Sequence, residues 1–164
     1  MNSLIRKAMH KDAEAFVQLM ESHMQSMYKT AWVYLKNEND VADAIQETIL
    51  NCYEKLDTLR NEKFFKTWMI RILINNCNNI LRQRHKFTST DKEIVNEYIE
   101  REYDLCEWKE MLNSLGEKYR TIVLLYYSEG LKVKEISDLL QLNKNTVLTR
   151  LARAKEQLKK EYGV

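Results

Sequence analysis

The feature that most restricts the fold of this sequence is its lack of turn residues, since 164 residues include no proline and only three glycines. Folds built from β-strands need turn residues every few positions, and Rossmann or P-loop sites need glycine-rich loops. A chain of helices needs neither. Hydrophobic residues form 45% of the chain and charged residues 30%, which is typical of a globular protein. We therefore expect an all-α fold of one ordinary domain or two small ones.

The sequence also argues against several classes of function. Its longest apolar run, residues 122–127, is far shorter than the roughly 18 residues of a membrane span, so we expect a cytoplasmic protein without membrane insertion. The three histidines are dispersed, and no nucleophile–base pair or metal-ligand spacing is present, so we predict no catalytic site, no metal and no cofactor. Reduced thiols are expected at Cys52, Cys77 and Cys106.

Charge is distributed unevenly along the chain, although the net charge is only +2. Two basic blocks, residues 60–86 and 132–161, have net charges of +6 and +4. Two acidic blocks, residues 36–57 and 87–110, have net charges of −4 and −5. Two basic blocks separated by an acidic one indicate two nucleic-acid contacts on one chain, although solvated helix faces are charged as well.

The spacing of apolar residues divides the chain into two helical domains. In the first, Asp12 and Asp40 are expected to cap the helices that follow them, and a loop over residues 57–63 precedes a long helix. The acidic segment 87–109 has weak periodicity, so we interpret it as a linker between domains at 1–86 and 110–164.

The long helix after residue 63 has one polar and one apolar face. Its core side is expected at Phe65, Trp68 or Met69, Ile72 and Ile80. The opposite face repeats at spacings of four, four and three, through Arg71, Asn75, Asn79 and Arg82. Asparagine is a mediocre helix former, so an asparagine-rich face points to a function, with a merely solvated face as the alternative.

The second domain has the pattern of a helix-turn-helix over residues 132–159. An apolar stripe from Leu112 to Tyr126 predicts a buried helix face that ends at Gly130. A short helix and a turn follow, and Asn143 is expected to cap the last helix. In this motif the second helix lies in the major groove, and the polar outer positions here include Lys144, Asn145, Thr149, Arg150 and Arg153. A plain helical hairpin is the alternative.

Several ordered blocks of this sequence resemble the extracytoplasmic-function sigma factors of bacterial RNA polymerase. Asp43-Ala-Ile-Gln46-Glu47 is similar to the region 2.2 block, and Phe65-Lys-Thr-Trp68-Met-Ile-Arg71-Ile-Leu-Ile-Asn75 is similar to regions 2.3 to 2.4. Leu115-Gly-Glu-Lys-Tyr119-Arg, Glu129-Gly130-Leu131 and Asn145-Thr146-Val147-Leu-Thr-Arg150-Leu-Ala-Arg153-Ala154 resemble region 4. The resemblance implies an alternative sigma factor that directs core polymerase to specific promoters and has no catalytic chemistry of its own.

The resemblance also implies which surfaces bind which partner. Asp43, Gln46 and Glu47 would bind the β′ clamp helices of the polymerase, with the β subunit as a further partner, because carboxylates and amides suit a basic partner. The −10 element of promoter DNA would be held, with one base flipped out, by Asn51, Lys55, Arg60, Asn61, Lys63, Arg71, Asn75, Asn79 and Arg82. The −35 element would be bound by Lys144, Asn145, Thr146, Thr149, Arg150 and Arg153.

Family membership further implies an anti-sigma factor, soluble or membrane-bound, that masks these surfaces. The sequence departs from the family pattern at the turn, where Gln141 replaces the common glycine, and in the last helix at Leu148 and Ala152. Two other functions remain open at this point. One is a helix-turn-helix regulator that acts without polymerase, and the other is a helical adaptor that binds only protein.

Overall fold

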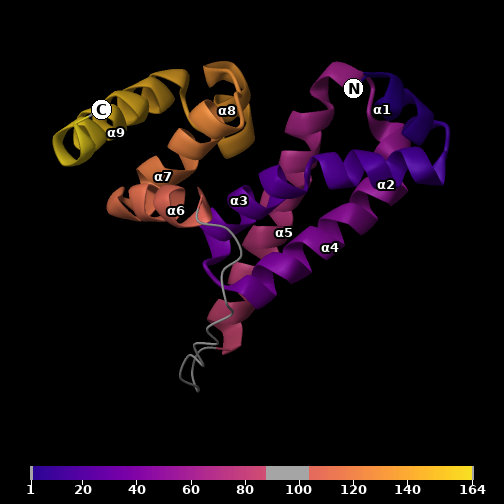
Figure 1. Ribbon diagram of the computed structural model, residues 1–164, viewed down its shortest axis with the longest axis horizontal. Helices are drawn as coiled ribbons and strands as arrows, with labels where there is room; N and C mark the ends of the chain where they lie inside the picture. The colour runs from indigo at the N-terminus through magenta and orange to yellow at the C-terminus, as the bar shows by residue number, and fades with distance from the viewer. Residues whose placement is uncertain (1, 88–103, 164) are drawn as a thin grey trace. The chain divides into compact units, whose positions relative to one another are not determined.

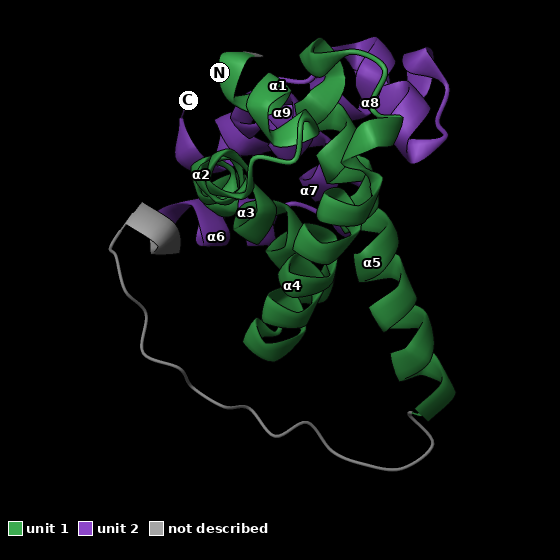
Figure 2. Ribbon diagram, turned by 90° about the vertical axis from the view of Figure 1, so that its right-hand side faces the viewer, with its two compact units in different colours: residues 1–91 green, residues 92–164 purple. Residues whose placement is uncertain are grey.

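The computed structural model describes residues 2–87 and 104–163, and every regular element within them is helical, so the all-α prediction is confirmed. The chain forms two compact units, residues 1–91 and residues 92–164 (Figure 2). Residues 88–103, most of the expected acidic linker, lie outside the described residues. Within the described ranges, none of the helices combines the length and apolar character that a membrane crossing requires.

The first unit consists of five helices and two short 3-10 turns. The helices are α1 (Asn2–Met9), α2 (Ala13–Ser22), α3 (Met24–Leu35), α4 (Glu38–Lys55) and α5 (Phe65–Phe87), and the turns are Leu56–Thr58 and Glu62–Phe64 (Figure 1). α3, α4 and α5 pack against one another and α1 packs on α2. The spacing predicted every helix of this unit except α1.

The buried side of α5 is wider than the single stripe that the spacing predicts. Phe65 and Met69 are buried as expected, but Ile70, Leu73 and Ile74 are buried in place of Ile72 and Ile80, which are only half-buried. The reason is that α5 packs against both α3 and α4, so two adjacent rows of side chains are covered. Trp68 is half-buried, with its ring centroid 5.9 Å from that of Phe65.

The cap of α2 is predicted correctly and the cap of α4 is not. The Asp12 carboxylate accepts a hydrogen bond from the backbone N–H of Ala15 at 3.0 Å. The side chain that caps α4 is Asn37, which accepts from the backbone N–H of Asp40 at 3.1 Å. Asparagine is as good an N-cap as aspartate, and the earlier residue adds almost a full turn of helix. Asp40 instead lies in the first turn of α4 and forms an ion pair with Arg84 of α5.

The second unit is built from α6 (Asp104–Ser114), α7 (Glu117–Val123), a π-helical turn (Leu124–Ser128), α8 (Val133–Leu140) and α9 (Lys144–Tyr162). Buried Arg120 of α7 donates to the backbone oxygens of Leu112 and Leu115 at 2.8 and 3.0 Å. Its cation therefore satisfies carbonyls at the negative C-terminal end of α6. Gln157 of α9 donates to Ser114 O at 3.0 Å, so α9 holds the same helix end.

The π-helical turn changes which residues of this region are buried. Within it, the backbone N–H of Glu129 reaches back five residues to Leu124 O, at 3.0 Å. The wider turn moves later residues out of the α-helical register. Leu124 and Leu125 are buried, while Tyr126, which the apolar stripe predicts as core, is 38% exposed. Gly130 ends the segment as predicted, with a φ of 68°.

Candidate functional site

The first candidate surface is the exposed side of α4. Asp43, Gln46 and Glu47 are all exposed, whereas Val41, Ala44, Ile45 and Thr48 on the other side are buried. Gln46 and Glu47 follow Asp43 by three and four residues, so all three side chains lie on one face of the helix. α4 therefore presents two carboxylates and an amide to solvent, a combination that suits a basic partner.

A polar network runs from this surface into the core of the first unit. Asn76 of α5 is 8% exposed, and its amide donates to Thr48 Oγ1 at 3.0 Å and to Asn51 Oδ1 at 3.3 Å. Asn51 in turn donates to the Glu47 carboxylate at 3.2 Å. Sequence reasoning missed Asn76, although an asparagine that interrupts the apolar side of a helix is a recognisable signal of a buried hydrogen bond.

The second candidate surface is the polar face of α5. Arg71, Asn75, Asn79 and Arg82 are all exposed, as the spacing predicts. Arg82 donates to the Asn79 side-chain oxygen at 2.8 Å, so the guanidinium orients that amide. The face therefore combines amides, which can pair with the edge of an unpaired base, with cations that neutralise phosphate.

The segment between α4 and α5 supplies further basic residues. Lys55, Arg60 and Lys63 are exposed. Asn61 is also exposed, but its side-chain oxygen accepts from the backbone N–H of Lys63 at 3.0 Å and so caps the 3-10 turn. Glu62 accepts two hydrogen bonds from Arg6 of α1, at 2.7 and 2.8 Å, which ties the segment to the N-terminal helix. This pairing lowers the pKa of Glu62.

The third candidate surface is the helix-turn-helix formed by α8 and α9. Gln141 ends α8 in the left-handed region, with φ 54° and ψ 42°, and its side chain donates to Asp138 O at 2.8 Å. Asn143 caps α9, as predicted, by accepting from the backbone N–H of Asn145 at 2.9 Å. Val147, Leu151 and Ala154 form the buried seam of α9, so its opposite side faces solvent.

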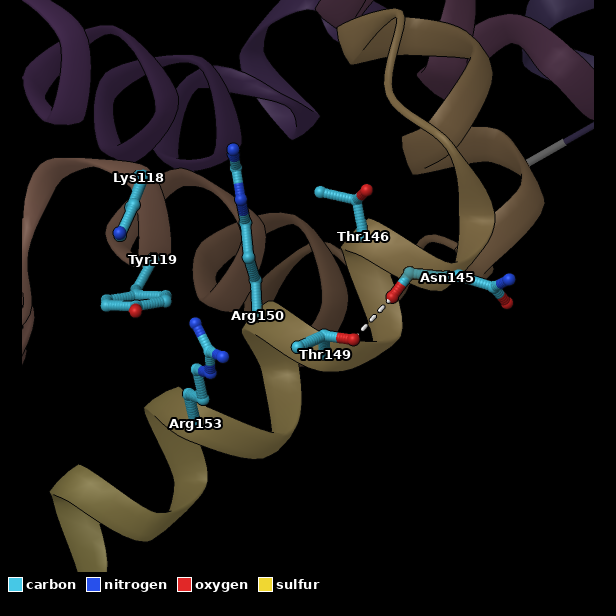
Figure 3. Close-up of a pocket in the computed structure, with 7 residues that line it drawn as sticks. All are labelled: Lys118, Tyr119, Asn145, Thr146, Thr149, Arg150 and Arg153. Atoms are coloured by element: carbon cyan, nitrogen blue, oxygen red, sulfur yellow. Dashed lines mark hydrogen bonds between the residues drawn. The ribbon is translucent and has the colours of Figure 1, made fainter.

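The predicted contact residues of α9, with the exception of Lys144, line an open hollow of about 350 Å³ (Figure 3). Thr146, Arg150 and Arg153 are at spacings of four and three and lie toward α7, whereas Asn145 and Thr149 lie along the edge of the hollow (Figure 3). Lys144 is exposed in the first turn of the helix but does not line the hollow.

Two residues of α7 that sequence reasoning missed complete this hollow, namely Lys118 and Tyr119 (Figure 3). The Lys118 ammonium lies 5.1 Å from the centroid of the Tyr119 ring. The pKa of Tyr119 is lowered, first because Arg153 donates a hydrogen bond to the phenol oxygen and further because of the charge of Lys118. The hollow therefore gathers three cationic side chains, those of Lys118, Arg150 and Arg153.

The described cysteines do not form a reactive site. Cys52 of α4 and Cys77 of α5 are buried and free. Desolvation raises the pKa of each thiol to about 12, so both stay protonated at neutral pH. They contribute to packing in the first unit.

Comparison with known proteins identifies the family of the chain. The family model of Sigma-70 region 2 matches residues 19–87, and the family model of Sigma-70, region 4 matches residues 107–158. The chain belongs to the sigma-70 family of bacterial RNA polymerase sigma factors, in its extracytoplasmic-function (ECF) group. It is a transcription factor that binds core RNA polymerase and directs initiation at specific promoters.

The similarity extends over most of the chain. RNA polymerase sigma factor SigV of Bacillus subtilis is 35% identical over 142 residues, which cover 84% of this chain and 85% of SigV. ECF RNA polymerase sigma factor SigW of the same organism is 25% identical over 175 residues, covering 96% and 94%. The sigma factor RpoE of Bartonella quintana, solved in complex with the anti-sigma factor NepR, shares the fold with a TM-score of 0.72 and 21% identity, covering 91% of this chain and 97% of RpoE.

Proposed function

We propose that the three exposed surfaces divide the work of promoter recognition between the two domains. Residues 1–86 bind core polymerase and the −10 element, residues 110–164 bind the −35 element, and residues 87–109 connect them. The observation that carries this proposal is that each compact unit exposes a basic, amide-bearing helix face of its own. A regulator that acts without polymerase needs only the second of these faces.

The acidic face of α4 is the proposed polymerase contact. Asp43, Gln46 and Glu47 are exposed on neighbouring turns, and Asn51 donates to Glu47, which restricts the carboxylate. Charge-assisted hydrogen bonds to the basic β′ clamp helices follow from this chemistry. Contacts with the β subunit complete the assembly in our proposal.

The −10 element is proposed to bind the polar face of α5 and the segment before it. Asn75 and Asn79 would bind the edge of a base that has left the stack. Unstacking a base costs a few kcal/mol, and binding in a fixed pocket must offset that cost. Arg71, Arg82, Lys55, Arg60 and Lys63 would neutralise phosphates. Asn51 and Asn61 are both held by hydrogen bonds, so we assign them to shaping the pocket wall.

The −35 element is proposed to bind α9 and the hollow beside it. Asn145 and Thr149 face outward and can reach base edges, while Lys144 and Thr146 flank the capped helix N-terminus, which suits a phosphate. Arg153 lies beside Tyr119 in the hollow, and Lys118 adds a second cation, so we assign this pair of basic residues to the DNA backbone. Arg150 is half-buried and can both brace α9 and reach DNA.

We further propose that an anti-sigma factor, soluble or membrane-bound, controls this chain by masking these surfaces. The structural likeness to RpoE, which was solved bound to NepR, supports this proposal at the level of the fold. We also propose that the protein acts in the cytoplasm and carries out no reaction of its own, because nucleotide addition belongs to the polymerase.

Gel shift and run-off transcription on a promoter library, with and without core polymerase, test the proposed function. We expect specific binding and transcripts only when core polymerase and the chain are both present. Specific duplex binding that is unchanged by core polymerase would identify a regulator acting alone. Absence of DNA affinity at every salt concentration, with or without core polymerase, would identify a protein-binding adaptor.

A further inference from the structure

The outward side of α9 carries two different rows of side chains. One row, Thr146, Arg150 and Arg153, faces the hollow beside α7. The other row is Asn145, Leu148 and Ala152, which follow one another at spacings of three and four. All three residues of this second row are exposed, and Leu148 is 51% exposed although the buried seam of α9 begins at its neighbour Val147.

An exposed leucine in this position has a natural partner in the DNA major groove. Thymine alone among the four bases presents a methyl group there, and apolar side chains discriminate it by contact. Ala152, one turn further along, is small and lets the groove floor come close to Leu148. Asn145, one turn earlier, offers an amide of the kind that pairs with adenine.

We propose that Leu148 is a specificity-determining residue that contacts the C5-methyl group of a thymine in the −35 element. The inference rests on the proposed docking of α9 in that element. At this position the promoter base would be recognised by shape and apolar burial. A charged side chain at the same position would bind a guanine or a phosphate instead.

The charge of the helix favours DNA over a protein partner for this row. α9 carries six lysines and arginines against two glutamates, so the leucine lies within a strongly basic surface. An apolar patch on such a surface suits the floor of a groove whose walls are phosphates, because the cations bind the walls and the leucine meets the bases.

Replacing thymine with uracil provides a test that removes only the methyl group and keeps base pairing. Holoenzyme is assembled from core polymerase and the full chain, a preferred promoter is selected from a randomised −35 library, and each thymine of that element is replaced in turn. Burying one methyl group changes affinity by about fourfold. We expect that loss at one thymine for the parental holoenzyme, and we expect Leu148→Ala to bind the thymine and uracil duplexes equally.

Two further variants make the outcome specific. Leu148→Met keeps an apolar side chain and should retain part of the discrimination, whereas Tyr162→Ala, at the far end of the same helix, should retain all of it. A parental holoenzyme that binds the −35 duplex but ignores every methyl group, or a Leu148→Ala holoenzyme that keeps the fourfold ratio, overturns this inference alone. A holoenzyme with no −35 preference overturns the proposed function as well. Weaker assembly of Leu148→Ala with core polymerase at an unchanged ratio would assign the leucine to a protein contact and also overturn the inference.

Discussion

The amide of Asn76 on α5 donates a hydrogen bond to the Thr48 hydroxyl on α4, at 3.0 Å, inside the core of the first unit. The same amide donates to Asn51, and Asn51 donates to Glu47 at the surface. Two side-chain hydrogen bonds in series, Asn51 to Glu47 and Asn76 to Asn51, therefore link the proposed polymerase contact to α5, the helix that is proposed to bind the −10 element. The Thr48 hydroxyl in turn donates a hydrogen bond to Ala44 O, so both the Thr48 hydroxyl and the Asn76 amide nitrogen at the buried end of the network have partners.

Asn76→Ala should therefore lower the free energy of unfolding by about 1–3 kcal/mol, because it removes one buried and one part-buried hydrogen bond and leaves the Asn51 oxygen without its partner. Urea denaturation of the parental chain and the variant measures this difference. Asn78→Ala, on the same helix, is the matched control and should change stability by less than about 0.5 kcal/mol. A loss below about 0.5 kcal/mol for Asn76→Ala as well would mean that the Asn76 network contributes no measurable stability.

Gln46→Ala combined with Glu47→Lys should weaken binding to core polymerase more than tenfold, because a charge-assisted contact contributes about 1.5–3 kcal/mol. Fluorescence anisotropy of labelled protein titrated with core polymerase gives the Kd. Glu54→Lys makes the same charge change at another exposed position of α4 and should have a small effect. Unchanged affinity of the well-folded double variant would remove α4 from the polymerase interface.

Asn75→Ala and Asn79→Ala should each reduce open-complex formation by about fivefold or more, since one good base-edge contact contributes about 1–3 kcal/mol. Permanganate reactivity of unpaired thymines at the −10 element measures opening, and the −35 footprint should persist. Gln83→Ala, exposed on the same helix, is the control. If both asparagine variants open promoters at the parental rate, this face of α5 is only solvated.

Arg153→Ala should weaken binding to all −35 sequences alike and lower the salt slope by about one, as expected for a phosphate contact. Arg150→Ala distinguishes base recognition from phosphate binding. If Arg150 contacts a base, its loss should remove the sequence preference at one promoter position, whereas loss of a phosphate contact should weaken all sequences alike. Binding to a randomised −35 library at two salt concentrations separates these outcomes. Parental affinity in both variants would mean that α9 does not dock as proposed.

Gln141→Gly should raise the free energy of unfolding by about 1 kcal/mol, because a residue with a Cβ pays a conformational cost in the left-handed region. Gly130→Ala provides the converse test. Its φ is 68° and no atom lies within 4 Å of an added Cβ, so any loss of stability comes from the backbone alone. Thermal unfolding followed by circular dichroism checks both, and a neutral or destabilising Gln141→Gly would contradict the expectation.

Local patterns predicted the parts of this structure that depend on local physics. Apolar spacing located the described helices other than α1, and Asp12 and Asn143 were identified as caps because each has a suitable side chain directly before an apolar stripe. The exposure of Arg71, Asn75 and Asn79 followed from the same periodicity. Their DNA contacts remain predictions.

What the sequence did not predict depends on packing between segments or on unusual backbone geometry. Asn76 was missed because its partners lie on α4, about 25 residues earlier. The exposure of Tyr126 follows from a π-helical turn, which has no reliable sequence pattern. Lys118 and Tyr119 were missed because they meet Arg153 only after α7 and α9 have packed.

The hydrogen bonds that Arg120 and Gln157 make to the end of α6 also govern how the second unit folds. Gln157 and its acceptor Ser114 are 43 residues apart in sequence, so this helix end is completed only when the final helix has docked. A fragment cut before α9 would leave the Ser114 carbonyl without the Gln157 amide and would lack the buried seam of Val147 and Leu151. The amide protons of α6, α7 and α9 should therefore exchange with solvent through one shared opening, and the promoter-reading helix is also the last structural support of its own domain.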